Sequence, residues 1–162
     1  MKVIVAIDQT ENWKQVIDAV GKRRWPADTA FRILTVVAPE EWQDLEFADT
    51  NDILREIVRL RCITAERILQ AARQKLSEAF PDCSVHVELR KGSPRVEILD
   101  AAVDWMPDKI VLGAHGHDPN RLLPSTVSRA VAQYAKCSVE LVRFKSAVKP
   151  DTNGKHREAS RV

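Results

Sequence analysis

The chain has 162 residues, 44% of them hydrophobic and 30% charged, and carries a formal net charge of +2. A chain of this length is expected to form a single domain with a sizeable core, and its near-average composition argues against a wholly disordered, fibrous or collagen-like protein. No apolar run approaches the roughly 20 residues that span a bilayer, and the N-terminal sequence lacks a secretory signal pattern. We therefore expect a cytoplasmic protein with no membrane partner.

Positive charge is concentrated at the C-terminus. Residues 144–162 contain five Lys or Arg and two acidic residues, so the other 143 residues carry a net charge of −1. A nearly neutral body is not typical of a nucleic-acid-binding surface, and we expect no nucleic-acid partner. Since residues 145–162 include Pro and Gly but almost no large apolar side chains, we predict a domain over 1–144 and a basic, disordered tail over 145–162.

The three cysteines are Cys62, Cys83 and Cys137, and they lie far apart in the sequence. Their number is odd, and no Cys or His stands at a spacing typical of a metal site, so neither a disulfide framework nor zinc is indicated. We predict reduced, inert thiols.

The hydrophobic pattern of the first forty residues alternates between two periods. Lys2–Ile7 is a short apolar run rich in β-branched residues, which predicts a strand buried on both faces. Apolar residues at helical spacing between Trp13 and Val20 predict a helix that ends before Pro26. Phe31–Val37 then predicts a second buried strand.

A long helix is predicted from about Asn51 to Ala79, with Pro81 ending it. Its predicted apolar stripe consists of Ile53, Ile57, Leu60, Ile68, Ala72 and Leu76. The charged residues between these positions are expected to form a solvated outer face with i,i+4 pairs.

The third strand and third helix are predicted next. Ser84–Leu89 alternates as a strand does, and Pro94 stands where the first turn of a helix tolerates proline. The helix that follows is predicted to carry one apolar face, made of Val96, Leu99, Val103 and Met106.

The last elements complete a repeating pattern. Lys109–Leu112 predicts a fourth strand, Ser125–Ala135 a helix carrying Val131 and Tyr134, and Ser138–Arg143 a fifth strand. This βαβαβαβαβ order predicts a single α/β domain: an open parallel five-stranded sheet with helices on both faces.

The loop after the fourth strand, GAHGHDPNRLLPSTVS (residues 113–128), is the most informative segment for function. Gly113 and Gly116 follow a buried strand directly, and Ser125 and Thr126 open a helix. Ligands of open parallel sheets bind beyond the carboxyl ends of the strands, and glycines together with a helix N-terminus suit a phosphate group. The alternative is that the glycines serve only the conformation of the turn.

With VAIDQT at the first strand and GAHGH…RLLPSTVSRAV…CSVELVR at the end, residues 1 to about 144 resemble the universal stress protein family. The resemblance implies a Rossmann-like, adenine nucleotide alpha hydrolase-like fold and a nucleotide-binding stress-response sensor or regulator, many members of the family binding ATP. The cofactor-binding residues that it implies are Ala6, Asp8, Val36, Leu112, Gly113, Gly116, Ser125, Thr126 and Val127. Asp8 would contact the nucleotide and the backbone of Val36 the adenine.

The chain departs from the family pattern in one place. The pattern has its third glycine where this chain has Ser125, and the spacer 117–124 is one residue short. A Cβ at this position would crowd a phosphate, and Pro124 lacks an N–H, whereas Ser125 is a good N-cap and could itself donate to an anion. We expect weakened ATP binding, Mg²⁺ only together with the nucleotide, no catalytic residue and at most slow ATP hydrolysis.

Two alternative interpretations of the function and one prediction of a partner complete the sequence analysis. His115, His117 and Asp118 could suggest a metal or a nucleotidyl-transferring enzyme, but the His-Gly-His sequence follows the fourth strand instead of the first, and we expect no metal. The resemblance implies a homodimer paired through Val139–Arg143, and other protein partners are unknown. The main alternative function is a dimeric interaction module of the same fold that does not bind ATP.

Overall fold

The computed structural model describes residues 1–38, 50–114 and 124–144, apart from the side chains of residues 50, 51, 53 and 54. One sheet of five parallel strands has the order β3-β2-β1-β4-β5. Its strands are β1 (Lys2–Ala6), β2 (Ala30–Val37), β3 (Ser84–Lys91), β4 (Lys109–Gly113) and β5 (Ser138–Val142). The helices are α1 (Trp13–Gly21), α2 (Thr50–Ala79), α3 (Pro94–Trp105) and α4 (Thr126–Tyr134). The predicted fold is confirmed.

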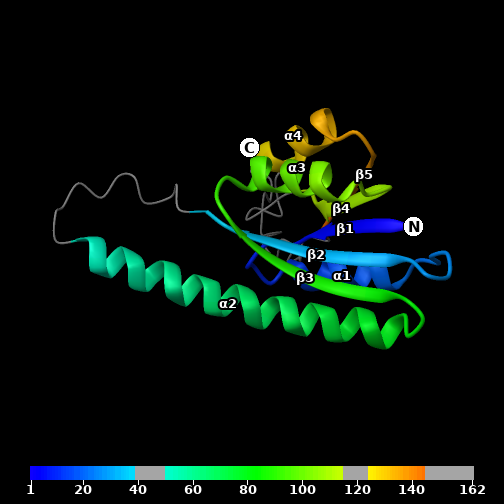
Figure 1. Ribbon diagram of the computed structural model, residues 1–162, viewed down its shortest axis with the longest axis horizontal. Coiled ribbons are helices and arrows are strands. Elements are labelled where there is room, and N and C mark those ends of the chain that lie inside the picture. Colours follow the sequence, from blue (N-terminus) through cyan, green and yellow to red (C-terminus); the bar gives the residue numbers. More distant parts are fainter. Residues whose placement is uncertain (39–49, 115–123, 145–162) are drawn as a thin grey trace, which may run out of the picture.

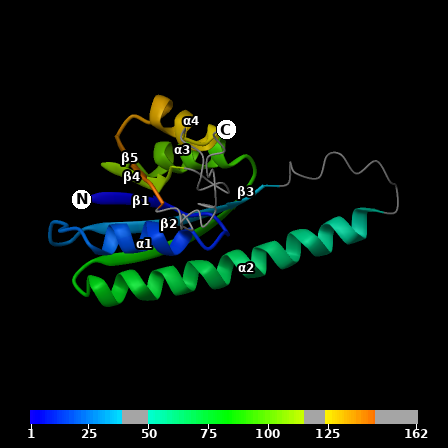
Figure 2. The ribbon, with the colours of Figure 1, turned by 180° about the vertical axis from the view of Figure 1, so that it is seen from behind.

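The sheet lies between two helical layers. Figures 1 and 2 show α1 and α2 on one side and α3 and α4 on the other. Along β1, Val3 and Val5 belong to the core on the α1–α2 side, whereas Ile4 and Ala6 belong to the core on the α3–α4 side. Because successive strand residues point to opposite faces, a strand covered on both sides must be apolar throughout, as this run is.

Large side chains fill the core on the α1–α2 side. The apolar residues whose spacing predicted α1 form its buried face, and Trp13 among them is 7% exposed. At the centre, the ring of Phe31 meets Trp25 edge-on, with 5.4 Å between centroids, and stacks on Phe80 at 5.7 Å. The N–H of Trp25 donates to the carbonyl of Val20 at 3.0 Å, so this aromatic group stays hydrogen-bonded while it is packed.

Only the second half of α2 packs into this core. Ala72 and Leu76 are buried as predicted, but Leu60 is 52% exposed, so its place in the buried stripe was wrong. With 30 residues at about 1.5 Å each, α2 is about 45 Å long, whereas the 8 residues of β3 span about 26 Å. The start of α2 therefore extends past the sheet (Figure 1), and within the described part of this helix the first buried side chain is Ala65.

The predicted apolar face of α3 is also wrong. Val96 is 45% exposed, Val103 67% and Met106 75%. The helix instead buries Ile98 and Ala101, which lie on its opposite side. Ala101 is fully buried, and because its side chain is only a methyl group it permits close approach of the helix to the sheet. Leu99 is half-buried, and Pro94 stands in the first turn as predicted.

A network of ion pairs and hydrogen bonds connects α3 with β3, the strand at one edge of the sheet. The Arg90 guanidinium pairs with Glu88 on its own strand at 2.5 Å and with Asp104 of α3 at 3.0 Å. Arg32 of β2 donates to Glu88 at 3.0 Å and lies 4.5 Å from the centre of the Trp105 ring. The edge of this core is thus covered by charged groups that satisfy one another.

Further features of the described residues concern the cysteines, membrane-spanning helices and groups of metal-ligating side chains. The three cysteines are free and half-buried, and no disulfide joins them. Among the described residues no helix is both long and apolar enough to cross a membrane, and no group of three or more His, Cys, Asp or Glu side chains could hold a metal ion. The segment 145–162, predicted to be a tail, lies outside the described residues.

Candidate functional site

The strand order places a topological switch point at β1. The chain builds outward from β1 through β2 to β3, then returns to the other side of β1 with β4 and β5. Crossover helices on opposite faces separate at such a point, and the space beyond the carboxyl ends of the strands is where ligands of these sheets bind. The strand ends β1, β2 and β4 are therefore the place to look for a site.

The register brings most of the predicted site residues to this edge. Ala6 pairs with Leu34 of β2 and with Leu112 of β4. Val36 stands two residues further along β2, whereas Asp8 and Ala114 follow the ends of β1 and β4, so all three lie at the carboxyl edge of the sheet. The ends of β1, β2 and β4, which are far apart in the sequence, thus lie side by side at the carboxyl edge of the sheet. The strand pairings locate these residues relative to one another and do not show a contact with a ligand.

Hydrogen bonds hold the end of β1 against β2. The hydroxyl of Thr35 donates to the carbonyl of Ile7 at 2.6 Å, and the N–H of Ile7 donates to the carbonyl of Leu34 at 2.9 Å. Asp8 accepts from the hydroxyl of Thr10 at 2.7 Å and from its N–H at 3.1 Å. This carboxylate therefore shapes the turn that leads into α1, a structural role that the sequence pattern did not indicate.

Gly113 has a packing reason to be glycine. A Cβ at this position would lie 2.5 Å from Cζ of the Phe144 ring, and Phe144 is itself buried against the α1–α2 core. The absence of a side chain at Gly113 therefore lets the chain beyond β5 close over the end of β4. Gly116, His115, His117 and Asp118 lie outside the described residues.

The start of α4 is tied to the end of β4. Ser125 is the N-cap, as predicted, and its hydroxyl accepts from the N–H of Ser128 at 3.1 Å. The N–H of Ser125 donates to the carbonyl of Ala114 at 2.7 Å, and the buried hydroxyl of Ser128 donates to the same carbonyl at 2.9 Å. Thr126 is exposed and Val127 packs against the α3–α4 core.

Ser128 is the residue of this region that sequence reasoning missed. It is fully buried, and it connects the helix start with the strand end. The signal available in the sequence is a serine three residues after the N-cap serine and three before Val131, so that it lies on the inward face of the helix. Through Ser128 the positive end of the α4 dipole is held at the carboxyl edge, where it favours an anion.

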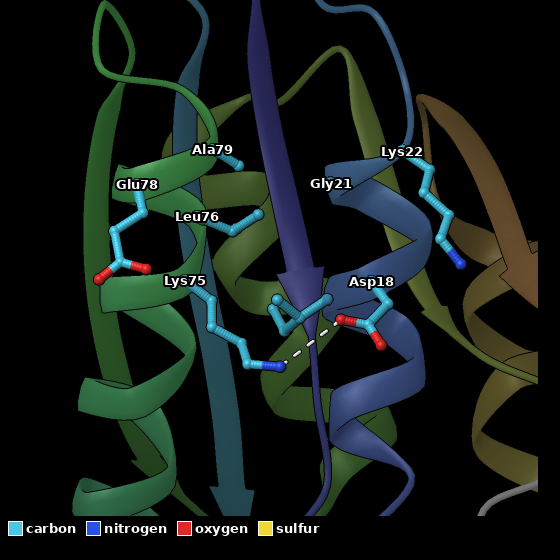
Figure 3. Close-up of a pocket in the computed structure, with 8 residues that line it drawn as sticks. Asp18, Gly21, Lys22, Lys75, Leu76, Glu78 and Ala79 are labelled. Atoms are coloured by element: carbon cyan, nitrogen blue, oxygen red, sulfur yellow. Dashed lines mark ion pairs between the residues drawn. The ribbon is translucent and has the colours of Figure 1, made fainter.

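A groove elsewhere in the described part of the chain has a different character. It lies between α1 and α2, has a volume of about 310 Å³, and has Ile17, Gly21 and Leu76 among the residues that line it. Lys75 and Asp18 reach across it with 3.6 Å between charged atoms (Figure 3). Ile17 and Leu76 are buried core side chains, and α1 ends here, at the amino edge of the sheet. This groove is a gap between two helices, away from the switch point.

Comparisons with known proteins find similar sequences over most of the chain. A sequence model described as "Universal stress protein family" matches residues 1–143. The chain is 31% identical over 85 residues to "Universal stress protein A homolog 2" of Coxiella burnetii, which covers 51% of this chain but only 58% of that relative. It is 26% identical over 155 residues to "Universal stress protein Sll1388" of Synechocystis, covering 88% of this chain and 97% of that relative.

Solved structures share the fold. The universal stress protein UspA from Lactobacillus plantarum superposes with a TM-score of 0.73 at 19% identity, covering 88% of this chain and 97% of that one. A universal stress protein family protein from Arabidopsis thaliana with AMP bound gives 0.67 at 18% identity, covering 94% and 97%. The universal stress protein from Archaeoglobus fulgidus in complex with dAMP gives 0.57 at 18% identity, covering 87% and 96%.

Proposed function

We propose, since this chain belongs to the universal stress protein family, that it binds an adenine nucleotide at the carboxyl edge of β1, β2 and β4. The observation that carries the proposal is the convergence there of Asp8, Val36, Gly113 and the capped N-terminus of α4. The AMP and dAMP complexes of similar proteins support the ligand class. In this proposal the protein is a cytoplasmic stress-response sensor or regulator and not a fast catalyst.

The order of strands suggests how the nucleotide would lie. The adenine meets the backbone near Val36 at the end of β2, and the phosphates meet Gly113 and the first turn of α4, where Ser125 and Thr126 stand. Backbone N–H groups and a hydroxyl at a helix start are suitable donors to phosphate oxygens. Mg²⁺ would arrive with ATP and neutralise part of the phosphate charge.

The test is calorimetric titration of the nucleotide-stripped full chain with Mg²⁺–ATP and with AMP. We expect binding at micromolar Kd for at least one of them. Ser125→Gly should tighten ATP binding because it removes the Cβ and hydroxyl that crowd a phosphate, while glycine remains an acceptable N-cap.

Thr126→Ala should weaken nucleotide binding by roughly tenfold, the loss of one hydrogen bond from a hydroxyl to a charged phosphate oxygen. The matched control is Thr64→Ala on α2, another exposed helical threonine, whose hydroxyl donates only to the carbonyl of Leu60 at 3.0 Å. Absence of heat up to millimolar ATP and AMP in the wild-type chain would refute nucleotide binding.

A second candidate function is favoured by two of the contacts described above. Gly113 is required by the Phe144 ring, and Ser125 is engaged in capping α4, so part of the loop pattern has an explanation without a ligand. The chain would then be a dimeric interaction module, with its protein partners unknown. The same titration separates the two functions.

We also propose that the chain forms a homodimer through β5. This strand is at one edge of the sheet, and its outer row of backbone N–H and C=O groups, from Val139 to Arg143, is available to a second copy. Sedimentation velocity at tens of micromolar should show a dimer. A single monomeric species at that concentration would overturn this assignment.

A further inference from the structure

Arg143 follows directly on the last residue of β5 and lies at the same edge as the proposed nucleotide site. Val142 and Phe144, on either side of it, both belong to the core on the α1–α2 side. Val139 and Leu141 pack against the core on the α3–α4 side. Because side chains alternate along an extended strand, Arg143 continues the row of Val139 and Leu141 on the side of α4.

Backbone hydrogen bonds connect the residue before this arginine to the start of α4 through Ala114. The carbonyl of Val142 accepts from the N–H of Ala114 at 2.8 Å, and the carbonyl of Ala114 accepts from the N–H of Ser125 at 2.7 Å. Arg143 is thus one residue beyond a continuous hydrogen-bonded chain that links β5, β4 and the helix N-cap. The anchoring of Phe144 against Gly113 limits how far the backbone at Arg143 can move.

The Arg143 side chain differs in its ion pairing from two arginines within the strands of the sheet. Arg32 and Arg90 are in ion pairs with carboxylates. Arg143 is exposed, and within residues 1–38, 50–114 and 124–144 its guanidinium has no ion-pair or hydrogen-bond partner. An arginine in this state can present its fork of N–H donors to phosphate oxygens, two at a time.

The strand order gives the direction of the ligand. Along the edge the strands run β2, β1, β4 and β5, and neighbouring strands are about 4.8 Å apart. If the base lies at β2 and the first phosphate at β4, the next position along the row is β5. Arg143 therefore stands where a second or third phosphate would extend.

We propose that Arg143 binds the β- or γ-phosphate of the nucleotide and makes the site prefer nucleoside di- and triphosphates over monophosphates. This inference rests on the proposed function, because it needs a nucleotide at the switch point. It assigns a specificity-determining residue that is neither part of the glycine pattern nor part of the helix start.

The experiment compares Kd values for ATP and AMP, measured by calorimetry on the full chain and on Arg143→Gln. We expect Arg143→Gln to weaken ATP binding by roughly tenfold or more, the loss of charge-assisted hydrogen bonds, and AMP binding by less than about threefold. Arg143→Lys should recover part of the ATP affinity, since it restores the charge but not the fork. The control is Arg73→Gln, which removes an exposed arginine from α2 on the other layer and should change neither Kd.

The outcomes separate the inference from the proposed function. Wild-type chain that binds neither nucleotide refutes both. Arg143→Gln that binds ATP as the wild-type does, or that loses ATP and AMP equally, overturns the role of Arg143 and leaves nucleotide binding in place. Because Arg143 adjoins the proposed dimer edge, sedimentation velocity is run on each variant, and an ATP loss that accompanies a change in oligomeric state also overturns the inference.

Discussion

The two helical layers cover the same sheet with different side chains. The α1–α2 layer buries large groups, among them Trp13, Leu69 and Leu76, whereas α3 and α4 bury Ile98, Ala101, Ser128 and Val131. The α3–α4 layer also leaves several large side chains exposed, with Val103 67%, Met106 75% and Tyr134 64% exposed, while Trp105 packs against its core. The difference shows that apolar spacing along a helix does not by itself identify the buried side.

The strongest test of this comparison is the same substitution on the two sides of α3. Ile98 is 5% exposed, and Ile98→Asp should lower the free energy of unfolding by more than about 4 kcal/mol, because it buries an unpaired charge. Val103→Asp, at a position 67% exposed, should change it by about 0.5 kcal/mol or less. Urea unfolding followed by circular dichroism measures both, and equal losses would contradict the assignment of the buried side.

The long helix of the other layer permits a comparison within one element. Leu76→Ala should cost about 2–5 kcal/mol of unfolding free energy, since Leu76 is fully buried and its truncation leaves a cavity. Leu60→Ala should cost less than about 0.5 kcal/mol, because Leu60 is 52% exposed where α2 extends past the sheet. The same urea titration applies. A large loss in Leu60→Ala would mean that this half of the helix is covered.

A smaller effect is expected from the polar connection in the α3–α4 layer. Ser128→Ala removes the buried hydroxyl that donates to the carbonyl of Ala114 at 2.9 Å, and should lower the free energy of unfolding by about 1–3 kcal/mol. Thr64→Ala removes an exposed hydroxyl from α2 and should cost a few tenths of a kcal/mol. Thermal and urea unfolding give the values, and near-neutral behaviour of Ser128→Ala would show that the connection does not hold the helix.

The smallest expected effect concerns a thiol beside the α3–α4 core. Burial and then the negative charge of Asp108 raise the pKa of Cys137. A raised pKa favours the neutral thiol, so at pH 8 less of Cys137 is thiolate than in a free cysteine, and iodoacetamide should alkylate it more slowly.

The rate is measured against pH in a Cys62→Ser/Cys83→Ser background, with free cysteine as reference. Asp108→Asn should speed the reaction by a fewfold at most, because it removes the second cause and leaves burial. Asp82→Asn, a change of charge near Cys83 instead, is the control. Alkylation of Cys137 as fast as that of free cysteine would contradict the raised pKa.

Much of the fold follows from local patterns. The β1 run is apolar at every position that two helical layers cover, and Ser125 with Thr126 marks the helix start that the structure has. The strand order in the sheet and the register do not follow from any one segment, and they are what bring Asp8, Val36 and Ala114 to the same edge of the sheet. Which residues meet at the edge is decided by pairing between strands far apart in the sequence.

Gly113 shows, for a single Cβ atom, that a contact between distant segments cannot be inferred from the local sequence. Two opposite explanations of this glycine, approach of a ligand and conformation of the turn, are available from the sequence. The structure adds a third, the Phe144 ring 2.5 Å from where a Cβ would be. A contact between residues 31 positions apart leaves no periodic signal, because neither residue belongs to a repeating pattern.

By itself the sequence determined the succession of strands and helices along the chain, the parallel sheet and the family. The alternation of two hydrophobic periods and the sequence of motifs are local properties of the chain. The tertiary structure decided which side of α3 is buried, where α2 leaves the sheet and how Ser128 and Phe144 close the edge of β4. These three features depend on how much space the packed helices and strands leave between them. A small residue such as Ala101 packs closely where a larger one would not, and only the assembled layers determine where that space is.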